Sequence, residues 1–178
     1  MSEPIGRELW RRNVRRSAAA IVASNALAAV VVFVYLSWVV PVPSIAHPGR
    51  VTLLNLVVFG VYLAVAFPIG WVWSMRRVRP IRAWMAAGGE PTPNVRDLAL
   101  RAPLRQLQIL AAGWAGAALL FFAVNVAISV ALAAEISVTI TLGGVVTSAL
   151  GYLLIERINR ATSALALAIG PPPKGMKV

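Results

Sequence analysis

Four long hydrophobic runs, separated by arginine-rich segments, dominate the sequence. The runs cover residues 18–40, 51–74, 107–132 and 136–155. A helix needs about 20 residues to cross a hydrocarbon core of about 30 Å, and each run reaches that length. Because 59% of the residues are hydrophobic and only 13% are charged, the chain has too few polar side chains to cover a water-soluble fold. The sequence therefore predicts an all-α integral membrane protein with four transmembrane helices.

The basic residues lie in three polar segments of this pattern. Of the 17 lysines and arginines, all except Arg50 fall in these segments. The segments are residues 1–17, 76–106 and 157–178. Short loops rich in Lys and Arg stay in the cytoplasm, so we expect both termini inside the plasma membrane and two transmembrane hairpins, at 18–75 and 107–156. The net charge of +11 follows from this topology, so the expected partner is the lipid bilayer and not a nucleic acid.

Two short connections form the outer turns of the expected hairpins. The first reads VVPVPSIAHPGR at residues 39–50. Its prolines Pro41 and Pro43 hold the chain extended, and Pro48–Gly49 is expected to turn it back before the second span. The second connection is expected at Ala133–Ala134–Glu135, and it must be tight because it contains no proline.

The stretches that follow the second and fourth spans resemble each other. GWVWSMRRVRPIRAWMAAGGEP at 70–91 and GYLLIERINRATSALALAIGPP at 151–172 share, without a gap, one order of aromatic, arginine, alanine, glycine and proline residues. This internal repeat indicates a duplicated unit, consisting of a hairpin and then a short helix at the cytoplasmic surface. Such a helix can lie in the headgroup region or against a partner. A helix that frays out of the membrane explains the pattern equally well.

Three asparagines lie inside the predicted spans, where polar side chains are costly. They are Asn25, Asn55 and Asn125. Each can hydrogen-bond across the bundle, which is worth about 1 kcal/mol, or it can contact a ligand. In the fourth span, Gly143, Thr147 and Gly151 recur every four residues. These small residues predict a smooth ridge for close packing, against a helix of this chain or of another.

The composition leaves little room for a catalytic centre. There is no cysteine, and His47 is the single histidine, which excludes Cys- or His-based metal clusters and a charge-relay triad. Phosphoryl chemistry with two metal ions needs at least two well-placed carboxylates, and Glu90 with Asp97 is a poor pair. We therefore expect no catalytic residue and no cofactor in this chain.

Two stretches resemble the N-terminal membrane domain of actinobacterial membrane-anchored class III adenylate cyclases. They are VPVPSI at 40–45 and LGGVVTSALGYLLIERINRATSALALAIGPPP at 142–173. Members of this family are similar in having six spans, a HAMP relay helix pair and a cytoplasmic cyclase domain that works as a dimer. The resemblance implies a homodimeric anchor and sensor whose cyclase domain, with ATP and Mg or Mn, lies outside this chain. It also implies a lipid or fatty acid as a ligand.

The chain departs from the family pattern at two places. It stops at Val178, where a third hairpin is expected, and it has Ala161 where family members tend to have a proline after the arginine. The first copy of the repeat, at 70–91, keeps this proline as Pro80. Candidate signal-transmitting residues therefore lie where the second and fourth spans end: Arg79, Pro80, Glu156, Arg157 and Arg160.

The leading expectation is a membrane-anchoring and regulatory domain of an adenylate cyclase. The alternative is a free-standing small membrane protein that acts as a partner subunit or scaffold. A small transporter is less well supported, because only scattered Asn, Ser and Thr residues lie in the spans.

Overall fold

The chain forms four long helices. The computed structural model describes residues 3–36 and 47–169, and this part contains no strand. The helices are α1 (Glu3–Val34), α2 (Pro48–Ala87), α3 (Pro93–Asn125) and α4 (Val130–Ile169). All four are long and apolar enough to cross a membrane, with a mean hydropathy of 1.8 to 2.2 in their most apolar stretches. The prediction of an all-α chain with four candidate transmembrane helices is therefore confirmed.

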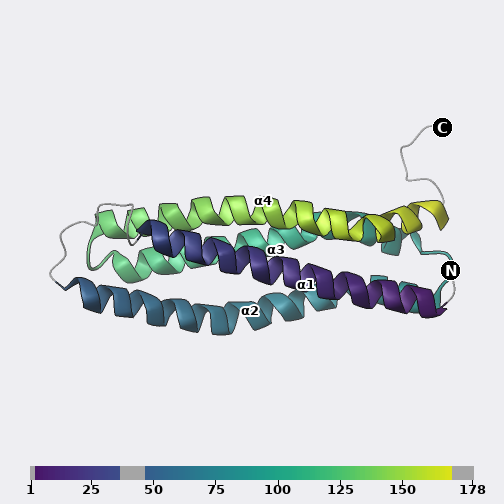
Figure 1. Ribbon diagram of the computed structural model, residues 1–178, viewed down its shortest axis with the longest axis horizontal. Helices are drawn as coiled ribbons and strands as arrows, with labels where there is room; N and C mark the ends of the chain where they lie inside the picture. The colour runs from purple at the N-terminus through teal and green to yellow at the C-terminus, as the bar shows by residue number, and fades with distance from the viewer. Residues whose placement is uncertain (1–2, 37–46, 170–178) are drawn as a thin grey trace.

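The four helices lie side by side in one elongated bundle (Figure 1). Successive helices run in opposite directions, so the start of α1 and the end of α4 lie at the same end of the molecule. Contacts join α1 with α2, α2 with α3, α3 with α4 and α4 with α1, and those between α3 and α4 are the most extensive. The bundle is therefore closed around its long axis.

The helices are longer than a membrane is thick. At 40 residues each, α2 and α4 extend over about 60 Å, twice the thickness of a hydrocarbon core. The short surface helices expected after the second and fourth spans are not separate elements, because these residues continue α2 and α4 without a break. Alanine, arginine and leucine favour helix, and α2 runs through Pro80 and ends only at Ala87.

The expected polar connector at 76–106 is therefore mostly helical. Only residues 88–92 separate α2 from α3. Gly88 and Gly89 have φ angles of 72° and 82°, a conformation that glycine adopts without strain. At the start of α3, the Thr92 hydroxyl accepts a hydrogen bond from the Val95 N–H at 3.4 Å, and Pro93 occupies the first turn, where it loses no hydrogen bond.

Two expected turn positions were wrong. The connection between α3 and α4 lies at residues 126–129, whereas Ala133–Ala134–Glu135 lies inside α4. Alanines favour helix, and the Ser129 hydroxyl caps α4 by accepting the Leu132 N–H at 3.3 Å. Likewise, Pro48–Gly49 begins α2 and does not form a turn before it. The rest of the first connection, including Pro41 and Pro43, lies outside the described residues.

The surface of the bundle divides into two halves along its length. We call residues 18–36, 47–74 and 107–155 the apolar half, and residues 3–17, 75–106 and 156–169 the arginine half. In the apolar half, large hydrophobic side chains face outward, with exposed fractions of 60% at Ile69, 73% at Leu119 and 63% at Val145. This outer surface suits contact with lipid chains and not with water.

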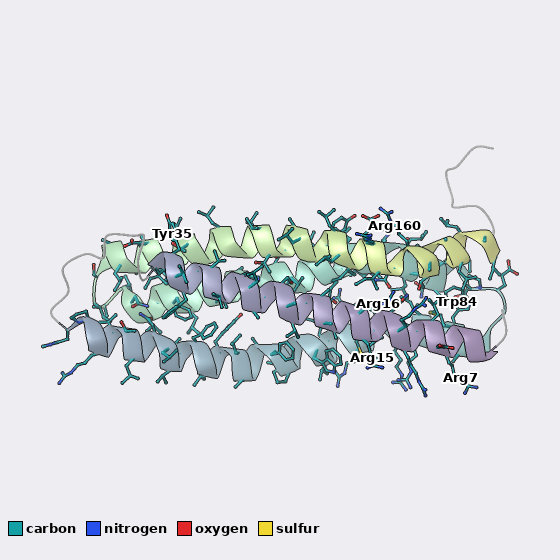
Figure 2. The ribbon with its side chains drawn as sticks, in the orientation of Figure 1. Arg7, Arg15, Arg16, Tyr35, Trp84 and Arg160 are labelled. Atoms are coloured by element: carbon teal, nitrogen blue, oxygen red, sulfur yellow. The ribbon has the colours of Figure 1, made fainter. Side chains whose placement is uncertain are left out.

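In the arginine half, exposed positions mostly carry polar or charged side chains. Figure 2 shows Arg7, Arg15, Arg16 and Arg160 in the half of the bundle that holds Trp84, whereas Tyr35 lies near the opposite end. Most other arginines of this half are exposed as well. The arginine half thus has the surface of a water-soluble helical bundle.

Each half has a hydrophobic core of its own. In the apolar half, the core consists of Ala117, Ala118, Phe121, Leu132, Ile136 and Ile140. In the arginine half, it consists of Ile81, Trp84, Met85, Ala99 and Ala166. Both cores include residues of α3 and α4, so these two helices connect them.

Candidate functional site

The structure brings Asn55 of α2 and Asn125 of α3 together inside the apolar half. Asn125 Nδ2 donates to Asn55 Oδ1 at 2.8 Å, and Asn55 Nδ2 donates to Asn125 Oδ1 at 3.1 Å. Asn125 Nδ2 also donates to the Phe121 carbonyl at 2.8 Å, and Asn125 is fully buried. The two amides satisfy each other, which favours helix–helix packing as their role over ligand contact.

The third asparagine lies at a separate position. Asn25 Oδ1 accepts a hydrogen bond from Trp114 Nε1 at 3.1 Å, and Asn25 Nδ2 donates to the Ile21 carbonyl of its own helix at 2.8 Å. Asn25 therefore joins α1 to α3. The three asparagines do not form one polar site. They form two separate contacts between helices.

Two further polar contacts that we did not identify from the sequence hold helices together in this half. The Tyr62 hydroxyl of α2 donates to the Gly113 carbonyl of α3, and the Ser137 hydroxyl of α4 donates to the Ala118 carbonyl at 3.0 Å. Acceptors on the main chain are present at every residue, so residue types alone do not point to them. Tyr62 and Ser137 therefore act, like the three asparagines, as links between helices.

The predicted small-residue ridge of α4 packs within this chain. A Cβ atom added to Gly143 would lie 2.8 Å from Val32 Cγ2 of α1, and one added to Gly151 would lie 2.9 Å from Leu110 Cδ1 of α3. Thr147, between them, is 2% exposed, and its hydroxyl donates to the Gly143 carbonyl at 2.7 Å. The ridge thus packs against α1 and α3 and is not available to a second copy.

Among the glycines of α4, the closest approach to another helix occurs at Gly144, which the four-residue spacing does not include. A Cβ atom there would lie 2.5 Å from Trp114 Cβ and 2.7 Å from Trp114 Cγ. Because Trp114 Cβ is attached directly to the backbone of α3, a side chain at this position would force the two helices apart. Gly144 and Trp114 therefore set the distance between α3 and α4.

The candidate signal-transmitting residues lie on the outer surface of the arginine half. Arg79, Pro80, Arg157 and Arg160 are exposed. Arg160 Nε lies 3.6 Å from Glu156 Oε1, one helical turn away, with side chains 73% and 40% exposed. The ion pair of Glu156 and Arg160 therefore lies within α4, and a pair on one exposed helix face adds little stability.

Two buried polar groups have no hydrogen-bond partner within the described part of the chain. Arg96, 8% exposed near the start of α3, leaves its Nη1 unpaired, and Ser148 on α4 leaves its hydroxyl unpaired. No group of three His, Cys, Asp or Glu residues comes together anywhere in residues 3–36 and 47–169. These residues therefore offer no cluster suited to a metal ion.

The site that emerges is a set of contacts between helices, concentrated on α3 and α4, with polar links in the apolar half. This arrangement holds the four helices in one packing, and the part of the chain that the structure describes brings together no group of three His, Cys, Asp or Glu residues. No protein family, curated protein or solved structure matches this chain.

Proposed function

We propose that the chain is a membrane-anchoring and sensory domain that regulates a catalytic domain on the cytoplasmic side. By the resemblance to class III adenylate cyclases, the regulated domain is a cyclase that lies outside this chain, and that domain would hold ATP with Mg or Mn. The residues of this chain would contribute packing and relay, but no chemical step.

The observation that carries the proposal is the continuity of α4. It is a single helix with buried residues along its length, from Leu132 to Ala166. Ile136 and Ile140 belong to the core of the apolar half, and Ala166 belongs to the core of the arginine half. Because one helix is packed into both cores, a rotation or tilt in the apolar half would move the packing of the arginine half.

The orientation is part of the proposal. Arginine-rich segments stay on the cytoplasmic side, and the arginine half carries most of the basic residues, the start of α1 and the end of α4. We therefore place both termini in the cytoplasm and the apolar half in the plasma membrane as two hairpins. The proposed assembly is a homodimer, because the cyclase domains of the resembling family work in pairs.

A lipid or fatty acid is the proposed signal. It would act from the lipid-facing surface, since the amides of Asn55 and Asn125 are already paired with each other. For a signal to shift the bundle, it must bind two packings with different affinity. An Asn125→Leu variant should therefore keep its response to an added fatty acid; loss of the response would place the ligand at the amides instead.

The first test is the natural polypeptide itself. An antibody against residues 1–16 would isolate it from native membranes, and its mass and its formation of cAMP from ATP with Mn²⁺ would be measured. We expect a polypeptide well above 19.0 kDa that forms cAMP. A band near that mass without cyclase activity would overturn the proposal and favour the free-standing partner subunit, and solute uptake by liposomes would identify a transporter.

The relay is tested by a matched pair of substitutions on α4 in that polypeptide. Ala166 is fully buried in the core of the arginine half, whereas Ala161 is exposed. Ala166→Leu overfills the core and should change cAMP formation several-fold, whereas Ala161→Leu should leave it unchanged. Equal output from both variants would show that the packing of α4 does not control the catalytic domain.

A further inference from the structure

A groove between α2 and α3 lies where the two halves of the bundle meet. It is shallow, with a cavity volume of about 20 Å³, and it is otherwise open to the surroundings. Its polar lining consists of Arg77 and Ser74 from α2 and Arg105 and Gln106 from α3, and aliphatic side chains such as Val78 complete the walls. We call it the junction groove. Its two arginines come from two different helices.

Among the residues whose side chains the structure describes, the two guanidinium groups have no acidic partner. Two other arginines of the arginine half form ion pairs, Arg101 with Asp97 at 2.8 Å and Arg160 with Glu156 at 3.6 Å. No carboxylate of residues 6–36 or 47–169 pairs with Arg77 or Arg105. Two like charges beside one groove repel each other unless an anion lies between them, so the junction groove favours a negatively charged occupant.

The remaining contacts order the groove before anything binds. The Arg77 guanidinium carbon lies 4.8 Å from the centroid of the Trp73 ring, a cation–π contact that holds the side chain without cancelling its charge. Ser74 Oγ donates to Gln106 Oε1 at 2.9 Å and joins the two helices beside the arginines. Both arginines are half-buried, so less side-chain entropy is lost when an anion binds.

The position along the bundle identifies the source of the anion. On α2, the outward-facing apolar residues end at Trp71 and Trp73, which are 43% and 44% exposed. Tryptophans of this kind lie at the level of the lipid headgroups. Arg77 follows one turn later, which is the level of lipid phosphates. A lipid in this position would also lay its acyl chains on the exposed apolar surface.

We propose that the junction groove binds the headgroup phosphate of an anionic phospholipid, held by Arg77 and Arg105 together. Arginine suits this role because its planar group can donate two parallel hydrogen bonds to phosphate oxygens. A zwitterionic lipid is a poorer occupant, since its own cation offsets the phosphate. The bound lipid would join α2 to α3 at the point where signals must pass between the halves. The proposal requires a bilayer around the apolar half, but it does not depend on a cyclase.

The test uses the full chain in nanodiscs made of phosphatidylcholine and phosphatidylglycerol. Native mass spectrometry then measures which lipid stays bound to the chain after the chain is released from the nanodiscs. The wild-type chain should retain phosphatidylglycerol in preference to phosphatidylcholine. The Arg77→Gln/Arg105→Gln variant should lose about tenfold in this preference, as expected when charged hydrogen bonds are removed. Equal retention by the variant and the wild type would overturn the proposal.

A matched control removes the same charge from the same helices. Arg76 and Arg101 are exposed and do not line the groove, so Arg76→Gln/Arg101→Gln should keep the preference. An equal loss in this control would show that the positive charge of the chain attracts anionic lipids in general, and it would refute a specific site. If the groove variant unfolds, Arg77→Lys/Arg105→Lys keeps the charge and removes paired hydrogen bonding. It should show an intermediate preference, and a preference equal to the wild type would contradict the proposed geometry.

A final arm separates a lipid from a free anion. The full chain in a neutral detergent is heated with inorganic phosphate or with short-chain phosphatidylglycerol, and the melting temperature is compared. Stabilisation by the lipid alone supports the proposal. Equal stabilisation by inorganic phosphate would make the groove a general anion site and would overturn its assignment to a lipid.

Discussion

The two halves of the bundle are built in opposite ways. In the arginine half, large apolar side chains such as Trp84 and Met85 are buried and arginines face outward. In the apolar half, large apolar side chains such as Leu119 face outward, whereas much of the interior is small or polar, as at Gly144 and Asn125. The same four helices thus change their packing about halfway along their length.

The difference is what the proposed placement, with the apolar half in lipid and the arginine half in water, would require. In water, burying apolar area drives helices together. In lipid, the acyl chains are as apolar as leucine, so association depends on close approach of backbones and on hydrogen bonds between helices. In that placement, α3 and α4 would be held together chiefly by the hydrophobic effect in the arginine half and chiefly by close fit and hydrogen bonds in the apolar half.

The largest expected effect concerns the core of the arginine half. Trp84 is 7% exposed, and its Nε1 donates to the Gly89 carbonyl at 3.1 Å. Trp84→Ala should lower the free energy of unfolding by about 3–5 kcal/mol, as for other large-to-small core changes. Trp71→Ala, at a position 43% exposed, should change it by less than about 0.5 kcal/mol. Unfolding in detergent micelles, followed by circular dichroism, measures both, and similar effects would contradict a water-type core in this half.

Steric fit should dominate in the apolar half. Gly144→Ala places a methyl group against the Trp114 Cβ and should destabilise the bundle by about 1–3 kcal/mol. At Gly60, an added Cβ meets nothing within 4 Å, so Gly60→Ala should stabilise α2 by up to about 1 kcal/mol through helix propensity. The two substitutions are chemically identical and should differ in sign when unfolding is measured in detergent. The same sign for both would mean that α3 and α4 are not in close contact at Gly144.

The hydrogen-bonded amides of Asn55 and Asn125 should contribute less to the free energy of unfolding than the close contact at Gly144. Asn55→Leu and Asn125→Leu each leave one amide without its partner, and each should cost about 1–2 kcal/mol. The double variant should cost clearly less than the two single effects added, because both singles break the same pair. A thermodynamic double-mutant cycle measures this coupling. Additive effects would show that the amides act independently. Thr141→Val is the control, since the Thr141 hydroxyl is exposed and bonds only to its own helix.

The smallest effect is expected on the outer surface of the arginine half. Glu156→Gln removes the ion pair with Arg160, which joins exposed side chains one turn apart. Such pairs contribute about 0.3–0.5 kcal/mol, so the free energy of unfolding should change by no more than that, and less at high salt. A loss above about 1 kcal/mol would indicate that Glu156 has a buried partner and belongs to the core rather than to the surface.

The number and character of the helices could be predicted from the sequence alone. Hydropathy over about 20 residues is a local sum, so the four spans were recognisable without any contact being known. The three asparagines and the ridge of Gly143, Thr147 and Gly151 were also found by local rules. The asparagines were expected inside the bundle because a polar group within a predicted transmembrane helix needs a hydrogen-bond partner.

Several local errors arose where tertiary contacts or weak capping signals decide the outcome. The turn was wrongly placed at Ala133–Ala134–Glu135 because the actual connection, residues 126–129, contains no glycine or proline that would mark it. Its one local signal is Ser129, which caps the start of α4. The arginine-rich residues after Ser74 have the composition of a surface segment. They form long helices because Ile81, Met85 and Ala99 bury one face against α1 and α4.

The sequence by itself determined that the chain forms four apolar helices flanked by arginine, because length and hydropathy act residue by residue. Only the tertiary structure decided which helix each small or polar residue contacts: Asn125 with Asn55, Asn25 with Trp114, and Gly144 with Trp114. It also decided that Arg77 and Arg105 share one groove. These pairings depend on the rotation of each helix about its axis, and that rotation is set by the packing of all four helices together.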